Sequence, residues 1–363
     1  MWGWLKQLKK TGNEQGPICC SRETFSRRER TANKIRGYNL VLIKMRLFVR
    51  HGLSARVTNG AGCLIFPVPD MDTALVTIGP APHRRLPEWI RQRVPGGERY
   101  AYLKNVLREF KLHTVCEEAK CPNMGECWAH GAATFMLMGD VCTRRCNFCA
   151  VDKGKPGYLD AAEPEHIATV VEAMKLDYCV LTSVTRDDLP DQGADHVART
   201  IEAIHGQLPS CKLEMLIPDF RGESACIERV VKTPLAVLAH NMETVPRLYK
   251  EVRPGAVYER SLRVLEMAKE FRPDILTKSG LMLGLGETRE ELLKVFADLR
   301  QHGCDILTLG QYLRPSEEQL TVVRYVTPQE FAEYKQDALQ LGFRHVESGP
   351  LVRSSYHAWE HVK

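Results

Sequence analysis

The sequence has no run of 18 or more apolar residues, so no segment is long enough to cross a membrane as a helix. It also lacks the apolar stretch and small-residue cleavage site of a secretory signal peptide. No hydrolase-type triad or glycosidase-type carboxylate pair is recognisable. These absences exclude the commonest secreted and membrane-spanning classes. We therefore expect a cytoplasmic protein without a membrane partner.

An excess of basic residues is missing outside the N-terminal segment. Residues 1–58 hold 13 Lys/Arg and three Glu, whereas residues 59–363 hold 37 Lys/Arg against 42 Asp/Glu. The formal net charge of +5 therefore arises from the N-terminal segment alone. Because the body of the chain is mildly acidic, it offers no broad basic footprint, and we expect no nucleic-acid partner.

The first 80 residues differ from the rest in charge and show little periodicity. Three interpretations remain open: a disordered tail, upstream sequence translated from too early a start, or an Arg-rich mitochondrial transit peptide. Met45 and Met71 are alternative starts under the second interpretation. A transit peptide would change the expected location to the mitochondrion. Under each interpretation, residues 1–80 are an extension without a role in the chemistry.

From about residue 98 onward, apolar runs alternate with amphipathic segments. The apolar runs predict strands at 135–138, 178–184, 213–217, 236–239, 280–285 and 306–309. Helical spacing predicts helices at 163–175, 194–207, 222–232, 259–271, 288–302 and 328–341. Six β–α units in series indicate an α/β fold with a parallel sheet, which we expect to form a partial (β/α)6 TIM-type barrel. Catalytic groups are then expected at the C-terminal ends of the strands.

Six of the 13 cysteines form two closely spaced triplets. They are Cys116, Cys121 and Cys127 (C-x4-C-x5-C), and Cys142, Cys146 and Cys149 (C-x3-C-x2-C). In a reducing compartment, clustered thiols bind metal more often than they form disulfides. Structural zinc generally takes four protein ligands, whereas three cysteines on a 4Fe–4S cluster leave one iron for another ligand. We interpret both triplets as iron–sulfur ligands, with a shared or irregular zinc site as the alternative.

The second triplet lies in GDVCTRRCNFCA, directly after the first expected strand. This stretch resembles the signature of the radical S-adenosylmethionine (SAM) superfamily. The resemblance implies that the three cysteines bind a 4Fe–4S cluster whose fourth iron takes the methionine moiety of S-adenosylmethionine. One electron then cleaves the sulfonium, and the 5′-deoxyadenosyl radical abstracts hydrogen from an unactivated carbon. A second stretch, SGLMLGLGE, resembles the superfamily's fifth-strand motif, which implies cofactor contacts by Gly280, Met282, Gly284 and Glu287.

The first triplet narrows the resemblance to one family. HTVCEEAKCPNMGECW is similar to the auxiliary-cluster motif of lipoyl synthases. Matching stretches continue in order over about residues 84–358, among them LTSVTRDDLPD, PDFRG, AHNMETVPRLY, VRPGA, LTLGQYLRP and GPLVRSSYHA. One departure is DQGA at 191–194, where the family usually has two glycines and this chain has Gln192.

Membership in this family implies a reaction, a second cluster and partners. Two sulfur atoms enter carbons 6 and 8 of a protein-bound octanoyl-lysine, and the auxiliary 4Fe–4S cluster on Cys116, Cys121 and Cys127 supplies them. Ser355, in the RSSY motif, corresponds to the family's fourth ligand of that cluster; the alternative is an ordinary tail serine. Expected partners are octanoylated lipoyl carrier domains of 2-oxoacid dehydrogenase complexes, the glycine cleavage H protein, and an electron donor such as ferredoxin or flavodoxin.

The same resemblance divides the chain after residue 80 into three parts. We expect the auxiliary-cluster segment at 81–134, the radical SAM barrel at 135–345, and a C-terminal tail at 346–363 that closes over the barrel mouth.

Several polar residues keep two interpretations. Asn241 is a candidate contact for the cofactor ribose or a helix N-cap, and Arg253 is a candidate contact for the cofactor carboxylate or a member of a surface salt bridge. Asp187, Asp188 and Asp191 are expected to stabilise the N-terminus of the helix that follows them. Two competing functions also stay open: a biotin-synthase-like sulfur inserter, and a zinc-ribbon-like binding module without catalysis. Iron and sulfide content separates the zinc module from the other two.

Overall fold

The computed structural model describes residues 134–362 continuously and shorter pieces before them. These pieces are strands β1 and β2, residues 86–90, and residues 101, 104, 105, 107, 108, 113, 114, 121, 123 and 127. The chain divides into two compact units, Met1–His83 and Arg84–Lys363. In the first unit, β1 (Ser54–Asn59) and β2 (Gly62–Pro67) form an antiparallel hairpin. The functional residues of interest lie in the second unit.

The second unit is built on an eight-stranded sheet with the order β12-β11-β10-β9-β8-β7-β4-β3. All neighbouring strands are parallel except β3, which pairs antiparallel with β4. The strands are β3 (His113–Thr114), β4 (Thr134–Leu137), β7 (Tyr178–Ser183), β8 (Lys212–Leu216), β9 (Val237–Ala239), β10 (Leu276–Leu283), β11 (Ile306–Gln311) and β12 (His345–Gly349). The predicted α/β class with a parallel sheet is therefore confirmed.

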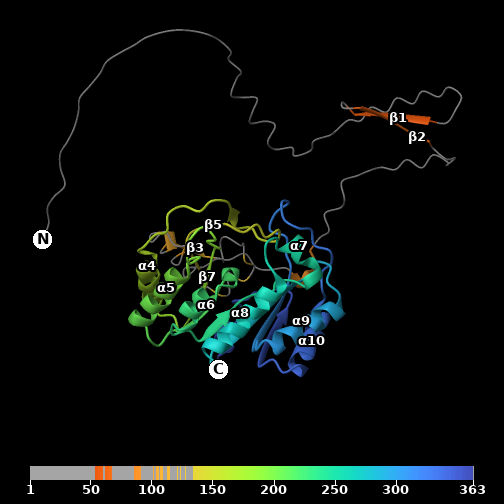
Figure 1. Cartoon of the computed structure of the whole chain (residues 1–363). Coiled ribbons are helices and arrows are strands. Elements are labelled where there is room, and N and C mark those ends of the chain that lie inside the picture. The colour runs from red at the N-terminus through yellow and green to blue at the C-terminus, as the bar shows by residue number, and fades with distance from the viewer. Residues whose placement is uncertain are drawn as a thin grey trace, which may run out of the picture. The chain divides into compact units, whose positions relative to one another are not determined.

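Helices alternate with these strands and cover the outside of the sheet (Figure 1). They are α4 (Glu163–Met174), α5 (Ala194–Gln207), α6 (Ser224–Val231), α7 (Tyr249–Val252), α8 (Tyr258–Phe271), α9 (Arg289–Gln301) and α10 (Pro328–Gln340). Short 3-10 turns are η2 (Glu88–Ile90), η3 (Phe220–Gly222), η4 (Pro246–Leu248) and η5 (Ala358–Glu360). Each of the six predicted helices is present within two residues of its expected bounds. Thr288 and Thr327 begin α9 and α10 with capping boxes, because T-x-x-E places a carboxylate over the first turn.

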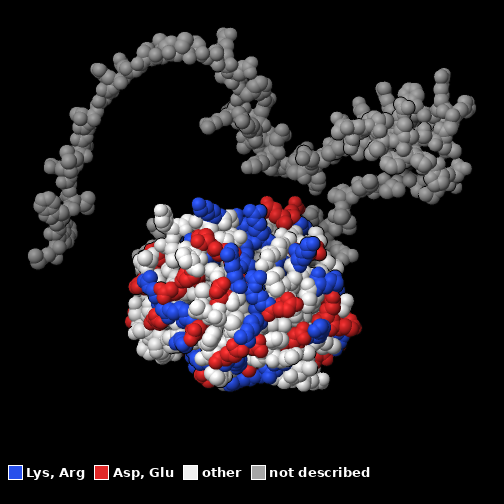
Figure 2. Space-filling view, in the orientation of Figure 1, with Lys and Arg blue, Asp and Glu red and all other residues white. Residues whose placement is uncertain are grey.

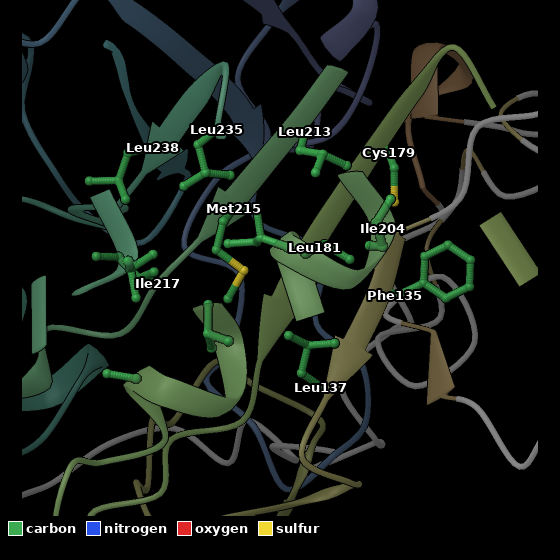
Figure 3. Close-up of a cluster of buried hydrophobic side chains, with 14 of the residues drawn as sticks. Phe135, Leu137, Cys179, Leu181, Ile204, Leu213, Met215, Ile217, Leu235 and Leu238 are labelled. Atoms are coloured by element: carbon green, nitrogen blue, oxygen red, sulfur yellow. The ribbon is translucent and has the colours of Figure 1, made fainter. Parts of the chain in front are cut away.

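Alternation along each strand separates a core from a cavity. One set of strand side chains faces the helices and packs into a buried apolar cluster. Figure 3 shows members of this set from β4, β7 and β8, including Phe135, Leu137, Cys179, Leu181, Leu213 and Met215. The alternate residues, such as Thr134, Met136, Val180 and Thr182, line a cavity on the other face. Because the cavity is lined from β4 to β11, the sheet curls around it as a partial barrel.

Three strands of this sheet differ from the sequence-based expectation. β10 begins at Leu276 rather than Gly280; its start was missed because Thr277, Lys278 and Ser279 are polar, yet they are fully buried. β3 and β12 were not expected at all, and β12 extends the sheet past residue 345, where the barrel was predicted to end.

The tail after β12 was predicted to close over the barrel mouth, and this closure stays a prediction. Residues 352–355 line the cavity, and the tail ends beside the N-terminal ends of β7 and β8, where Lys212 Nζ donates to the Val362 carbonyl at 3.3 Å. Figure 1 accordingly marks the C-terminus on the side of the molecule away from β5.

Acidic and basic side chains are intermixed over the face seen in Figure 2, with a narrow basic band down its middle. On α8, Arg260 pairs with Asp219, and Arg263 pairs with Glu266 and Glu270. None of the helices in the described part of the chain is long and apolar enough to span a membrane.

Candidate radical SAM site

A cavity of about 370 Å³ occupies the inside of the curled sheet. Two of the three cysteines of the second triplet, Cys142 and Cys149, line it from the loop after β4. Cys121 of the first triplet and Ser354 and Ser355 of the tail also line it. Residues that are more than 200 positions apart in the sequence therefore face one chamber.

The second triplet lies on a short loop held between strands β5 (Val141–Cys142) and β6 (Asp152–Lys153), which pair in parallel. The backbone amides of Arg144 and Thr185 point at the Cys142 sulfur, at 3.4 and 3.3 Å. These two contacts hold the Cys142 sulfur in a fixed position within the loop. The loop is also fixed from outside, since the Asn147 amide donates to the Val252 carbonyl at 2.9 Å.

The three sulfurs of this loop act electrostatically on one another. Burial raises the pKa of the Cys146 thiol to about 11; the Arg253 charge opposes this shift, and Cys149 and Cys142 add to it. Burial also raises the pKa of Cys149, and Cys142 adds to this shift as well. The three cysteines are half-buried on one loop, and thiolates suit iron–sulfur clusters.

Among the described residues, no three His, Cys, Asp or Glu side chains are placed to hold a single metal ion. The ligands of a 4Fe–4S cluster each bind a different iron, so they stand farther apart than the ligands of one ion. Three cysteines on one loop match the donor set of a cluster that keeps one iron open for another ligand.

Opposite the cysteine loop, a polar cradle lies where β9 meets β10. Gly280, Met282 and Asn241 line the cavity here. Asn241 Oδ1 is buried without a hydrogen-bond partner among the described residues. A Cβ atom on Gly280 would lie 2.7 Å from Thr308 Oγ1 and 3.0 Å from Asn241 Oδ1. An unpartnered acceptor beside an obligatory glycine is the arrangement expected where a flat, polar ligand approaches the backbone.

Asn241 is not a helix cap, which was its alternative interpretation. The next helical turn, η4, begins at Pro246 after Val245, and the Asn241 amide donates instead to Glu243 Oε1 at 3.0 Å. Glu243 also lines the cavity, and sequence reasoning missed it. Burial raises its pKa, although Arg253 and Asn241 act in the opposite direction. The sequence signal that could have found Glu243 is the N-x-E spacing directly after an apolar run.

Within the described part of the chain, Arg253 forms no salt bridge. Its Nη1 donates to the carbonyls of Asn241 and Met242 at 2.7 and 3.0 Å, so it holds the backbone of the cradle. Its Nε is buried without a partner among the described residues. A direct contact between Arg253 and the cofactor carboxylate stays a prediction.

Gly284 and Glu287 lie outside the lining of the cavity, unlike Gly280 and Met282. The Glu287 carboxylate accepts from the backbone amides of Gly284 and Leu285 at 2.6 and 2.9 Å. Gly284 has φ near +100°, and a Cβ there would lie 2.4 Å from the Arg324 carbonyl oxygen. These two residues shape the turn after β10, and their expected cofactor contact stays a prediction.

A second, smaller cavity adjoins the first and brings together the expected auxiliary ligands. Cys121, Cys127 and Ser355 line it, while Cys116 lies outside the described residues. Arg353 lines both cavities, and its charge lowers the pKa of Cys121, which burial raises. Asn123 donates to the Leu351 carbonyl at 2.6 Å and so ties the cysteine segment to the tail.

The three aspartates after β7 have different roles. Asp191 accepts from the amides of Gly193 and Asp195 and stabilises the start of α5, as predicted. The prediction is wrong for Asp187, which pairs with Arg144 and Arg221, and for Asp188, which pairs with Arg186. Gln192 takes a positive φ of 54°, and its side chain donates to the Phe220 carbonyl at 3.0 Å.

The curled parallel sheet, the three-cysteine loop at its C-terminal edge and the cradle opposite that loop define a radical SAM enzyme. Comparison with known proteins agrees: the radical SAM superfamily matches residues 136–299. Such an enzyme uses a 4Fe–4S cluster and S-adenosylmethionine.

A narrower family matches as well. The N-terminal domain of lipoyl synthase of the radical SAM family matches residues 71–121. A lipoyl synthase from Laribacter hongkongensis is 56% identical over 275 residues, which is 76% of this chain and 87% of that protein. Another from Rubrobacter xylanophilus is 56% identical over 277 residues, covering 76% and 86%, respectively. A third, from Thiobacillus denitrificans, is 55% identical over 284 residues, covering 78% and 91%. The chain belongs to the lipoyl synthase family and has lipoyl synthase function in lipoate biosynthesis.

Proposed function

We propose that this chain inserts two sulfur atoms at carbons 6 and 8 of a protein-bound octanoyl-lysine, using two 4Fe–4S clusters that face one chamber. The observation that carries this proposal is the shared cavity. Cys142 and Cys149 line it from the mouth, whereas Cys121 and Ser355 line it from the tail and the cysteine-rich segment. An octanoyl chain that lies in this cavity would be within reach of both sets of residues.

The residues present fit two clusters of different kinds. Cys142, Cys146 and Cys149 would hold the first, leaving one iron for the methionine moiety of S-adenosylmethionine. Cys116, Cys121, Cys127 and Ser355 would hold the second. When bound, the first cluster supplies the electron that cleaves the sulfonium, and the second supplies sulfur. A serine oxygen is a harder ligand than a thiolate, so it is the ligand most easily released from a soft iron–sulfur core.

The protein's own groups orient the reactants and exclude water. Arg253 holds the carbonyls of residues 241 and 242, which places the Asn241 side chain against Gly280. We propose that Asn241 and Glu243 take the ribose hydroxyls and that Gly280 and Met282 lie against the adenine. Apolar residues on the cavity wall, among them Leu216, Leu281 and Val352, suit an alkyl chain and keep a radical away from water.

The experiment that tests the two-cluster proposal combines metal analysis with two assays. Reconstituted protein should hold roughly eight irons and eight sulfides per chain, the content of two 4Fe–4S clusters. Replacing Cys142, Cys146 and Cys149 by Ala should halve the iron and abolish S-adenosylmethionine cleavage. Replacing Cys121 and Cys127 by Ala should also halve the iron while cleavage continues without lipoyl product.

Ser355→Ala tests the fourth ligand in the same assays. It should spare cleavage and sharply lower lipoyl yield on an octanoylated carrier domain. Zinc without acid-labile sulfide would overturn the whole proposal, whereas wild-type lipoyl yield from Ser355→Ala would overturn the ligand assignment alone.

We also propose which molecules this enzyme meets. Its substrates would be octanoylated lipoyl domains of 2-oxoacid dehydrogenase complexes and the glycine cleavage H protein, with ferredoxin or flavodoxin as electron donor. We propose a cytoplasmic location, and a mitochondrial one if residues 1–80 act as a transit peptide. A chain that begins at Met71 should keep both clusters and product formation, because no proposed ligand precedes Cys116. Loss of either from a folded shortened chain would assign a role to the N-terminal segment.

A further inference from the structure

The chain after Ser355 turns inward, to the inside of the curled sheet. It forms the single 3-10 turn η5, and the backbone amide of His361 closes on the Ala358 carbonyl at 3.2 Å. Ala358 is 1% exposed and His361 is 2% exposed, although both lie within six residues of the C-terminus. Ordering a segment this deeply buried costs conformational entropy, which its packing contacts must offset.

This turn contacts strands on two sides of the barrel. Ala358 packs against Tyr178 and Val180 of β7, with Trp359 and Val362 beside it. The His361 ring lies 4.5 Å from the ring of His345 on β12, centroid to centroid. Because β7 and β12 are not neighbours in the sheet, the turn spans the interior of the barrel.

The same turn holds Ser355 directly. The Ala358 amide donates to the Ser355 carbonyl at 3.4 Å, and the Tyr356 amide donates to the Arg353 carbonyl at 2.9 Å. Only two residues therefore separate Ser355 from Ala358, whose side chain packs against β7. In this conformation, Ser355 lines the same small cavity as Cys121 and Cys127.

The other side of Ser355 is held independently. The Gln311 amide donates to the Pro350 carbonyl at 3.3 Å, and Asn123 donates to the Leu351 carbonyl. A Cβ on Gly310 would lie 2.1 Å from the Val352 carbonyl oxygen, so the tail crosses β11 in close contact. Residues 350–352 are thus anchored before Ser355, and η5 anchors the chain after it.

We propose that the C-terminal plug, defined as residues 358–362, is a positioning element that fixes Ser355 against the cysteine-rich segment. Two plug residues, Ala358 and Trp359, line the small cavity together with Ser355. Its function is to keep the Ser355 hydroxyl from moving out of the small cavity. This inference rests on the proposed role of Ser355 as a ligand.

The test compares two changes on the same turn. Ala358→Asp places a charge between Tyr178 and Val180 and should expel the plug, because an unpaired buried carboxylate is costly. Glu360→Ala is the matched control, since Glu360 is exposed on that turn. The first readout is hydrogen–deuterium exchange of residues 353–358 in protein without clusters. Ala358→Asp should speed this exchange, whereas Glu360→Ala should leave it at the wild-type rate.

The second set of readouts uses reconstituted protein. In Ala358→Asp, S-adenosylmethionine cleavage should match wild type, while lipoyl yield falls about tenfold or more, as for lost outer-shell support of a metal site. The Mössbauer signal of the auxiliary cluster should lose the iron that differs from the three thiolate-bound irons. His361→Ala, which removes a plug side chain without adding charge, should shift both readouts in the same direction if Ala358→Asp does not fold.

Failure of this inference is distinguishable from failure of the ligand proposal. If Ser355→Ala lowers lipoyl yield while Ala358→Asp and His361→Ala keep wild-type yield, the plug does not position Ser355. If Ser355→Ala itself gives wild-type yield, the ligand proposal fails first. Equal exchange rates at residues 353–358 in Ala358→Asp and wild type would overturn the positioning role without any cluster present.

Discussion

Arg144 lies in the loop that carries Cys142, Cys146 and Cys149. It forms a two-point ion pair with Asp187, in the loop after β7. Arg144 Nη2 lies 2.8 Å from Asp187 Oδ1, and Arg144 Nε contacts Asp187 Oδ2. Nη2 also lies 3.1 Å from Asp219 Oδ1, after β8. The side chains are only 17%, 10% and 4% exposed, so solvent screens these pairs less than it screens surface pairs. One guanidinium therefore ties the cysteine loop to the loops that follow two strands.

The first prediction concerns this tie. Arg144→Gln should lower both the iron bound by the radical-cluster loop and the rate of S-adenosylmethionine cleavage, by about tenfold as for other outer-shell supports. Arg145→Gln is the matched control: Arg145 is exposed, and no ion pair to a described residue holds its guanidinium. The measurements are iron per chain and 5′-deoxyadenosine formation. Equal loss in the two variants would show that loop charge, and not the ion pair, matters.

The second prediction concerns the cradle. Gly280→Ala should weaken S-adenosylmethionine binding, because the new methyl group would lie 2.7 Å from Thr308 Oγ1 and 3.0 Å from Asn241 Oδ1. The shift should be visible in the dissociation constant measured by anaerobic equilibrium dialysis. Gly206→Ala, in α5 with no atom within 4 Å of its added Cβ, is the control and should bind normally. Normal binding by Gly280→Ala would remove this glycine from the cofactor site.

Periodic packing explains why most of the fold was predictable. Strands such as β7 and β11 are buried on both faces and read as apolar runs, and α5 and α9 carry apolar residues at helical spacing. β12 escaped prediction because its sequence, HVESG, is half polar and only Val346 is fully buried. The start of β10 was misplaced because Lys278 is fully buried, whereas a lysine in a sequence normally indicates an exposed position.

The candidate site was predictable where chemistry imposes a local spacing, as in the cysteine triplets. It was not predictable where residues distant in sequence meet. Arg144 and Asp187 are 43 positions apart, and nothing near either residue indicates the pairing. Glu287 resembled a cofactor contact because it belongs to a motif, yet its carboxylate serves the backbone of that motif. The path of the tail depends on packing between Ala358 and β7, which has no sequence signature.

The third prediction concerns pH and His240, which is buried between β9 and α8. In the tautomer that satisfies both contacts, Nδ1 donates to the Ile217 carbonyl at 2.9 Å and Nε2 accepts from the Ser261 hydroxyl at 3.0 Å. Burial and the charge of Arg253 lower the pKa of His240 from 6.5 to about 4, although Ile217 and Asp219 oppose this shift.

A lowered pKa in the folded state means that the unfolded chain takes up the proton first as the pH falls. Stability from neutral His240 is therefore complete above about pH 6.5 and declines between pH 6.5 and 4, by up to about 3 kcal/mol. Thermal unfolding midpoints of wild type and His240→Gln, measured from pH 7 to pH 5, should converge as the pH falls. Parallel curves would contradict a neutral buried histidine.

The fourth prediction concerns an ion pair inside the barrel. Lys278 Nζ lies 2.7 Å from Glu214 Oε1, and the Tyr178 hydroxyl donates to Glu214 Oε2 at 2.7 Å, with both charged side chains at most 1% exposed. Glu214→Ala should cost about 3–5 kcal/mol of unfolding free energy, because it leaves the Lys278 ammonium buried without its counter-charge. The double change Glu214→Leu with Lys278→Met should recover most of that loss, since it removes both charges and keeps the volume.

Glu228→Ala breaks the exposed pair with Lys232 and serves as the control, with an expected cost of about 0–1 kcal/mol. Denaturant unfolding of the four proteins without clusters gives the comparison. A double variant no more stable than Glu214→Ala would show that the barrel interior requires these polar groups for their hydrogen bonds and not for charge balance.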